Sequence, residues 1–182
     1  MILLVGKTTS GKSTIQKELN KLGYNSVVSY TTRPPRNGEV DGVDYHFVDV
    51  SKFRAMDLMG CFVETTSYNV ANGETWHYGS AVDDLKEDSV MIVNPEGLRL
   101  IKKLKSLKPI AFYLVVDEET IWDRLKRRGD DDTEARRRLM ADASDFVGII
   151  NDVEFCLKND WGINPEQMAK FIHELYMTAR GE

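Results

Sequence analysis

The segment GKTTSGKST, residues 6–14, decides the fold of this chain, because it joins a short apolar strand to an amphipathic helix. MILLV precedes this segment and IQKELNKLG follows it. Gly6, Gly11, Lys12 and Ser13 have the spacing G-x-x-x-x-G-K-[ST], in which backbone N–H groups surround phosphate oxygens. The motif also opens a helix, and a helix N-terminus attracts anions. The sequence therefore predicts a phosphate-binding loop.

The spacing also assigns roles within this loop. Lys12 is predicted to be catalytic by binding the β- and γ-phosphates of ATP, and Ser13 is predicted to hold Mg²⁺. Such a short motif also occurs by chance in unrelated proteins, so the strand before it and the helix after it carry the prediction. The predicted ATP-binding residues of the loop are Gly6, Thr8, Thr9, Ser10, Gly11, Lys12, Ser13 and Thr14.

Composition limits the class of protein. A chain of 182 residues with 42% hydrophobic and 29% charged residues is expected to form one globular domain. A net charge of -5 and a pI near 5.3 argue against a dedicated binder of nucleic acid or of an anionic membrane. Cys61 and Cys156 are too far apart for a disulfide framework or a C-x-x-C metal site, so a cytoplasmic location is expected. No apolar run approaches the roughly 18 residues of a membrane span, and no pattern predicts an oligomeric state.

Apolar runs alternate with helical patterns along the chain. Strands are predicted at ILLV, SVVSY, VMIVN, AFYLVV and EFCL, and helices over 12–22, 96–107, 118–127, 133–146 and 165–179. This alternation predicts an α/β fold with a parallel sheet that is covered on both faces. The last helix is expected to pack Met168, Phe171, Ile172 and Tyr176 on the core.

Residues 31–80 break the alternation and predict an inserted, mostly antiparallel subdomain. Arg33 and Arg36 lie on either side of Pro34 and Pro35, whose stiff backbone suits a clamp for a phosphate; a solvated basic loop is the alternative. Glu64 could accept two parallel hydrogen bonds from the N1–H and N2–H₂ edge of guanine, which adenine does not offer. A satisfied edge-strand carboxylate is the alternative for Glu64.

These stretches resemble one known family. SYTTRPPRNGEVDGVDYHFV resembles the nucleotide-binding signature of guanylate kinases, and GKTTSGKST is similar to their phosphate loop. RLKRRG, RRRL and LKND resemble the lid of that family and its later Asn-Asp pair near the adenine. The resemblance extends from Ile2 to about Asp160.

The resemblance implies a P-loop kinase fold with a five-stranded parallel core sheet flanked by helices. The expected core is 1–30, 81–124 and 139–182, with a nucleotide-binding insert over 31–80 and a helical lid over 125–138. It implies transfer of the γ-phosphoryl of MgATP to GMP or dGMP. The expected partners are small-molecule nucleotides, with Mg²⁺ as cofactor and no nucleic acid or membrane.

The resemblance also implies roles for single residues. The acceptor phosphate is expected to contact Arg33, Arg36, Tyr45 and Tyr78, and the guanine is expected to contact Ser29, Glu64 and Ser80. Catalytic arginines are expected at Arg36 and, in the lid, at Arg124, Arg128 and Arg138, with Arg128 and Asn159 also binding ATP. A hinged lid would bring its arginines in only when both substrates are bound. An exposed helix pair joined by salt bridges is the alternative for this segment.

Three departures from the family pattern keep alternatives open. Ile92 and Asn94 occupy the places of an acidic pair, so Asn94 is expected to face GMP without a charge. The segment 65–77 is longer than usual and is predicted to form a hairpin that turns near Asn72 and Gly73. Lys7 and Thr9 stand where the family commonly has Pro and Gly. The first two departures suggest a different or modified nucleoside monophosphate as acceptor. A non-catalytic interaction domain is a further alternative, although such domains tend to lack an intact phosphate loop.

The remaining candidates for chemistry are weak. His46, His77 and His173 share no metal-ligand spacing and are interpreted as structural. Trp76 is expected to pack on its own hairpin rather than on a base.

Overall fold

The computed structural model describes residues 1–36, 38–70, 73–128 and 132–181. It divides into two compact units, one formed by Met1–Ser26 with Glu87–Glu182 and the other by Val27–Lys86. The second unit contains the predicted insert 31–80 and extends a few residues beyond it at each end. None of the helices in the described ranges combines the length and apolar character of a membrane span.

The first unit is built on a five-stranded parallel sheet with the order β2-β7-β1-β8-β9. Its strands are β1 (Ile2–Val5), β2 (Asn25–Ser26), β7 (Ser89–Ile92), β8 (Ile110–Val115) and β9 (Phe155–Lys158). All four residues of β1 are buried, as expected for a central strand covered on both faces. The predicted α/β fold class is confirmed.

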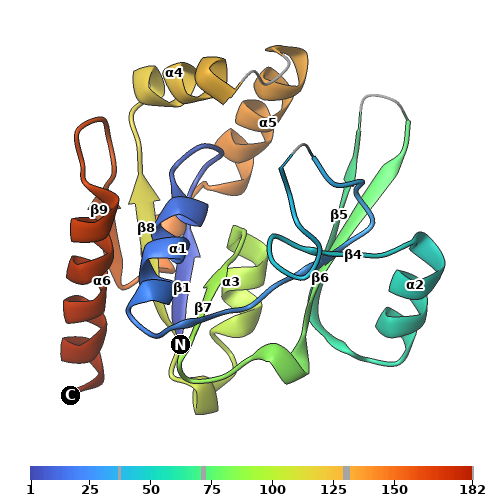
Figure 1. The fold of residues 1–182 in the computed structure, drawn as a ribbon, viewed down its shortest axis with the longest axis horizontal. Helices are drawn as coiled ribbons and strands as arrows, with labels where there is room; N and C mark the ends of the chain where they lie inside the picture. The colour runs from blue at the N-terminus through green and yellow to red at the C-terminus, as the bar shows by residue number, and fades with distance from the viewer. Residues whose placement is uncertain (37, 71–72, 129–131, 182) are drawn as a thin grey trace. The chain divides into compact units, whose positions relative to one another are not determined.

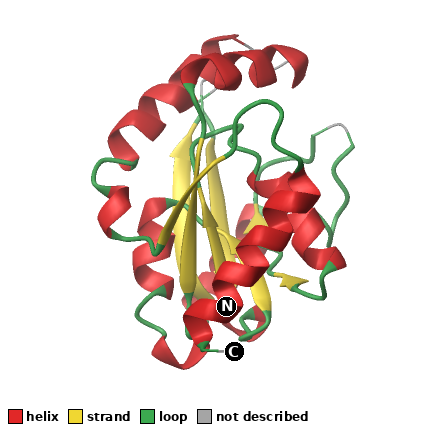
Figure 2. Cartoon of the chain, turned by 90° about the vertical axis from the view of Figure 1, so that its left-hand side faces the viewer, coloured by secondary structure: helices red, strands yellow, loops and turns green. Residues whose placement is uncertain are grey.

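Helices cover both faces of this sheet (Figure 2). They are α1 (Lys12–Lys21), α3 (Pro95–Ile101), α4 (Glu118–Arg128), α5 (Asp132–Asp145) and α6 (Pro165–Arg180), with short 3₁₀ turns at Lys105–Leu107 and Ile149–Asn151 (Figure 1). The helix predicted over 96–107 is therefore shorter, because regular helix ends at Ile101 and Lys108 adopts a left-handed φ of 44°.

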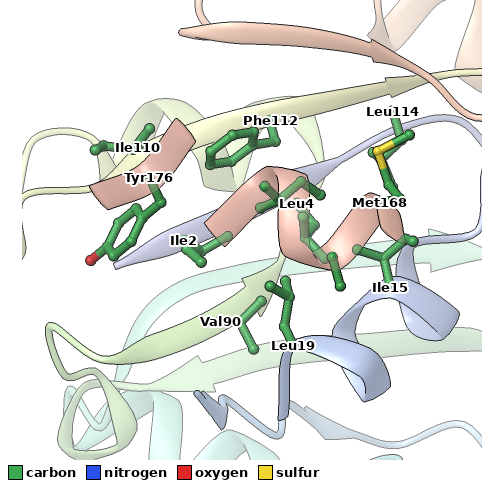
Figure 3. Packing of buried hydrophobic residues seen from close by; sticks show 12 residues of the cluster. Ile2, Leu4, Ile15, Leu19, Val90, Ile110, Phe112, Leu114, Met168 and Tyr176 are labelled. Atoms are coloured by element: carbon green, nitrogen blue, oxygen red, sulfur yellow. The ribbon is translucent and has the colours of Figure 1, made fainter. Parts of the chain in front are cut away.

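One face of the sheet forms the main hydrophobic core with α1 and α6. Ile2 and Leu4 of β1 belong to one buried cluster with Ile15 and Leu19 of α1, and Phe112 of β8 lies beside Leu4 (Figure 3). Met168, Ile172 and Tyr176 of α6 are buried in this core, as predicted.

The prediction that Phe171 packs on the core is wrong. Its side chain is 48% exposed. The buried stripe of α6 is formed by Met168, Ala169, Ile172 and Tyr176, and Phe171 lies outside that stripe.

The second unit is a four-stranded sheet with the order β4-β3-β6-β5. Its elements are β3 (Tyr30–Thr31), β4 (His46–Phe47), α2 (Val50–Leu58), β5 (Phe62–Asn69), β6 (Thr75–Ala81) and a 3₁₀ turn at Val82–Asp84. Two of its three strand pairings, β3 with β6 and β5 with β6, are antiparallel. The sequence did not predict α2, which begins after Asp49, whose side chain accepts a hydrogen bond from the N–H of Lys52.

The strand predicted at SVVSY is divided between the two units. Ser26 pairs with Val90 in the parallel sheet, whereas Tyr30 pairs with Gly79 in the second sheet. One run of β-forming residues therefore contributes strands to two different sheets. The composition of the run does not show this division.

Candidate functional site

The loop between β1 and α1, which is predicted to bind phosphate, contains two residues with positive φ, Thr9 and Gly11. Gly11 adopts a φ of 91° immediately before α1. This conformation is unfavourable for any residue that has a Cβ atom. A Cβ on Gly6 would lie 2.9 Å from the carbonyl oxygen of Leu114, so Gly6 also allows the loop to approach β8. Thr9 adopts a φ of 55° without being glycine, and its buried hydroxyl has no hydrogen-bond partner among the described residues. Such strain is typical of functional loops.

Lys12 lies folded over this loop. Its Nζ donates to the carbonyl oxygen of Gly6 at 2.6 Å and to that of Lys7 at 2.9 Å, and it lies 3.2 Å from Ser10 Oγ. The ammonium group is therefore held within the turn whose backbone N–H groups are predicted to bind phosphate. Ser13 and Thr14, in the first turn of α1, are exposed.

Asn159, which follows β9, and Arg124 of α4 both contact the backbone of the loop. Asn159 is 5% exposed and donates from Nδ2 to the carbonyl oxygen of Ser10 at 2.8 Å. Arg124 donates to the carbonyl oxygens of Thr9, at 3.0 Å, and of Asn159, at 2.8 Å. The structure thus brings three of the predicted ATP-site elements together: the loop, α4 and the residue that follows β9.

We expect Gly11→Ala to weaken ATP binding by about tenfold or more. A Cβ there would lie 2.5 Å from Asn159 Nδ2 and would push that amide away from Ser10. The positive φ adds strain of about 1–2 kcal/mol. Isothermal titration calorimetry with MgATP and thermal unfolding measure the two effects.

Gly23→Ala is the matched control. Gly23 also has a positive φ, of 98°, at the other end of α1, but a Cβ there meets nothing within 4 Å. It should lose similar stability and keep ATP affinity. Equal ATP affinity in the two variants would contradict this view of the loop.

The predicted lid arginines lie on α4 and α5. These helices pack through Ile121, Leu125 and Ala135, which are buried together. Arg138 is half-buried on α5. Arg128 is the last residue of α4, but its side chain lies outside the described part of the structure.

In the second unit, three of the predicted guanine-binding residues form one hydrogen-bonded cluster. Ser80 Oγ donates to Glu64 Oε1 at 2.7 Å and lies 3.0 Å from Ser29 Oγ. Ser80 is fully buried, and Glu64 is half-buried on β5 directly opposite it. The carboxylate is therefore held in a fixed orientation by the neighbouring strand.

A second cluster in this unit holds residues predicted to bind the acceptor phosphate. Arg33 is 3% exposed, and its guanidinium carbon lies 5.3 Å from the centroid of the Tyr45 ring. The Tyr45 and Tyr78 rings meet edge to face with centroids 6.0 Å apart. Burial raises the pKa of Tyr45, so its hydroxyl stays protonated at neutral pH and can donate to an anion.

Glu39 organises the arginine clamp and is absent from the residues predicted from the sequence. Its Oε1 accepts from Arg33 Nη2 at 2.8 Å, and its Oε2 accepts from the backbone N–H of Arg36 at 2.7 Å. An acidic residue three positions after the second arginine, next to Gly38, is the local signal that could have indicated this turn.

Asn94 belongs to the first unit, where it caps a helix. Its Oδ1 accepts from the N–H of Gly97 at 2.7 Å at the start of α3. Its predicted contact with GMP stays a prediction.

The predicted hairpin is formed by β5 and β6, and the N–H of Gly73 donates to the carbonyl oxygen of Val70 at 2.9 Å. Asn72, predicted in the same turn, lies outside the described residues.

The histidines have structural partners. His46 lies against Tyr30, His77 lies against Phe53 and close to Ser67, and His173 lies 2.8 Å from the hydroxyl of Tyr24. Among the described residues, no group of three or more His, Cys, Asp or Glu side chains could hold a metal ion. Trp76 pairs with Tyr68 across the hairpin.

Asp142 is the other residue that the sequence did not single out. Its Oδ2 accepts from the backbone N–H of Thr8 at 2.6 Å, so a carboxylate of α5 lies on the loop. An acidic residue one turn after Arg138 was the available signal, but helical spacing alone does not show what it faces.

Known proteins resemble this chain over its whole length. The family model described as guanylate kinase matches residues 1–174. A guanylate kinase of Rickettsia prowazekii is 30% identical over 185 residues, which cover 100% of this chain and 92% of the relative. A guanylate kinase of Alkalilimnicola ehrlichii is 34% identical over 141 residues, which cover 73% of this chain and 66% of the relative.

A solved structure shares the fold. The crystal structure of guanylate kinase from Anaplasma phagocytophilum superimposes with a TM-score of 0.69 at 18% identity, covering 100% of this chain and 86% of that one. The family match over residues 1–174 agrees with the loop between β1 and α1 and with the two side-chain clusters of the second unit. The chain belongs to the guanylate kinase family.

Proposed function

We propose that this protein transfers the γ-phosphoryl group of MgATP to GMP or dGMP, giving ADP and GDP or dGDP. The observation that supports GMP or dGMP as the acceptor is the position of Glu64. Its carboxylate is half-buried and accepts a hydrogen bond from the hydroxyl of Ser80. One carboxylate oxygen can accept from guanine N1–H and the other from its N2–H₂ group. The names of the relatives agree with this choice of base.

The acceptor phosphate is assigned to the arginine clamp. Arg33 and Arg36 are arranged by one carboxylate, that of Glu39, and the hydroxyls of Tyr45 and Tyr78 belong to the same unit. Guanidinium groups suit phosphate because they donate two parallel hydrogen bonds. Pairing with Glu39 keeps Arg33 ordered before the nucleotide arrives.

The donor phosphates are assigned to the loop Gly6–Thr14. In this role Lys12 would move its ammonium group from the loop carbonyls to the β- and γ-phosphates. Asn159 and Arg124 hold the loop through its carbonyl groups, so neither side chain occupies a backbone N–H group of the loop. Asn159 is predicted to lie near the adenine, and its side-chain amide donates to the loop backbone.

Mg²⁺ suits this site only as an ion that arrives with the nucleotide. The loop offers the exposed hydroxyl of Ser13, and no acidic cage exists among the described residues. Mg²⁺ typically keeps several waters and binds substrate phosphates with few protein ligands, so one hydroxyl is an adequate donor set. When bound, the ion would neutralise charge on the β- and γ-phosphates.

The lid role is assigned to 125–138, of which 129–131 lie outside the described residues. Phosphoryl transfer requires in-line alignment and neutralisation of charge on the transferred oxygens, which arginines supply. Arg124 and Arg138 lie on two helices that pack on each other.

A coupled assay of ADP formation against a panel of monophosphates tests the function. GMP and dGMP should give turnover, whereas AMP, CMP and UMP should be slower by roughly 10⁴-fold, because they do not offer Glu64 the two adjacent donors of guanine. Turnover with another monophosphate and none with GMP would overturn the acceptor assignment. No turnover with any acceptor, together with no binding of MgATP, would support a non-catalytic role.

A further inference from the structure

The phosphate loop already holds an anion that belongs to the protein. Asp142 of α5 places Oδ2 2.6 Å from the backbone nitrogen of Thr8 and accepts its N–H. Thr8 is the third residue of the motif and lies 134 positions away in the chain. The backbone N–H groups of such a loop are the donors that bind phosphate oxygens. A carboxylate on one of them occupies a position that suits a phosphate oxygen.

The charges around Asp142 are those that a phosphate would meet. Lys7 and Lys12 of the loop act on its carboxylate, Asp145 repels it from the same helix, and Tyr113 of β8 is within electrostatic reach. Burial raises the pKa of Asp142, against the lowering effect of the Thr8 N–H and the two lysines. Its negative charge is therefore held at the loop at an energetic cost, which displacement into water would relieve.

Lys12 is also engaged by the protein. Its ammonium group donates to the carbonyl oxygens of Gly6 and Lys7. In this state both an N–H donor of the loop and the motif lysine have partners within the chain. These two phosphate-binding groups of the loop therefore have partners within the protein when no nucleotide is bound.

We propose that Asp142 is an internal competitor for the donor phosphates, and that a phosphate entering the loop displaces its carboxylate from Thr8 and so releases α5. This inference rests on the proposed binding of ATP at the loop. Arg138 lies one helical turn before Asp142, on the same side of α5. Displacement of Asp142 thus links the arrival of phosphate to a shift of the helix that carries a lid arginine.

The test is titration calorimetry of MgATP with the full chain at about pH 8. Asp142→Asn keeps an oxygen acceptor but removes the competing charge, and it should bind MgATP about tenfold more tightly if Asp142 occupies the loop nine-tenths of the time. Asp145→Asn is the matched control, because it removes an exposed carboxylate from the same helix without a contact to the loop. It should change affinity by no more than about twofold.

The pH dependence separates competition from simple support of the loop. Protonated Asp142 does not compete, so the ratio of the wild-type to the Asp142→Asn dissociation constant should fall toward one as the pH is lowered toward the raised pKa of Asp142. Protonation of ATP changes both dissociation constants by the same factor, so it does not affect their ratio. A carboxylate that only supported the loop would instead make Asp142→Asn bind more weakly.

A measurement on the wild type covers the case in which the variant fails to fold. In an NMR spectrum the amide proton of Thr8 should shift as Asp142 titrates, and saturation with inorganic tripolyphosphate should abolish that shift. An unchanged titration with tripolyphosphate bound would overturn the competition. The competition would also be overturned if Asp142→Asn bound MgATP no more tightly than Asp145→Asn while the wild type bound it normally. A wild type that binds no MgATP would overturn the proposed function as well.

Discussion

Lys12→Ala should lower kcat/KM for MgATP and GMP by about 10³-fold, because the motif lysine supplies a positive charge to phosphates on which negative charge develops during transfer. Lys12 donates to the carbonyl oxygens of Gly6 and Lys7, which lie within its own loop. We therefore expect the melting temperature to change little. Steady-state ADP formation and thermal unfolding measure the two effects.

Lys7→Ala is the control for charge. Lys7 lies in the same loop and carries the same charge, but it is not the lysine of the motif and is not among the predicted ATP-binding residues. Its removal should lower kcat/KM by less than about tenfold, as expected for a screened charge. Equal losses in the two variants would show that the loop acts only through its net charge and would contradict a specific role for Lys12.

Glu64→Gln should lower kcat/KM for GMP by about 10²-fold or more while leaving the KM for MgATP unchanged. The amide keeps one oxygen acceptor but places an NH₂ group against a guanine donor, which leaves buried polar groups unpaired. Ser80 Oγ, which donates to Glu64 Oε1 at 2.7 Å, would keep a partner if the remaining oxygen faces it. Kinetics with GMP varied at saturating MgATP, and then the reverse, separate the two substrates.

Glu74→Gln is the matched control for this substitution. Glu74 lies on the same hairpin, and its carboxylate is 3.4 Å from the indole nitrogen of Trp76 at an exposed position. Its neutralisation should leave the kinetics with GMP unchanged. Inosine monophosphate, which lacks the N2 amino group, offers a second check: Glu64→Gln should reduce the preference of the wild type for GMP over this analogue. A preference as strong as that of the wild type would contradict the proposed contact.

The parts of the fold that the sequence predicted are those fixed by local pattern. A buried apolar run, a glycine-rich turn and an amphipathic helix are encoded within Met1–Lys21, so β1, the loop and α1 follow from neighbouring residues. The helix α2 was missed because it buries only Phe53 and so has a weak apolar stripe. Phe171 was misplaced because helical spacing does not show where a buried stripe ends.

The parts of the candidate site that the sequence did not predict depend on contacts between distant segments. Asp142 reaches Thr8 across 134 positions, and Asn159 reaches Ser10 across 149. No periodicity specifies such contacts; they arise when α5 and the residue after β9 pack beside the loop. The pairing of Glu39 with Arg33 spans only 6 positions but depends on an irregular turn, for which no sequence period exists.

The most direct test of the account follows the phosphoryl group itself. MgATP labelled with ³²P at the γ-position is incubated with the protein and unlabelled GMP, and the products are separated by chromatography. The label should appear in the β-phosphate of GDP in step with ADP formation, and Lys12→Ala should lose this transfer. Label that appears only in inorganic phosphate, or that stays in ATP while GMP is present, would contradict it.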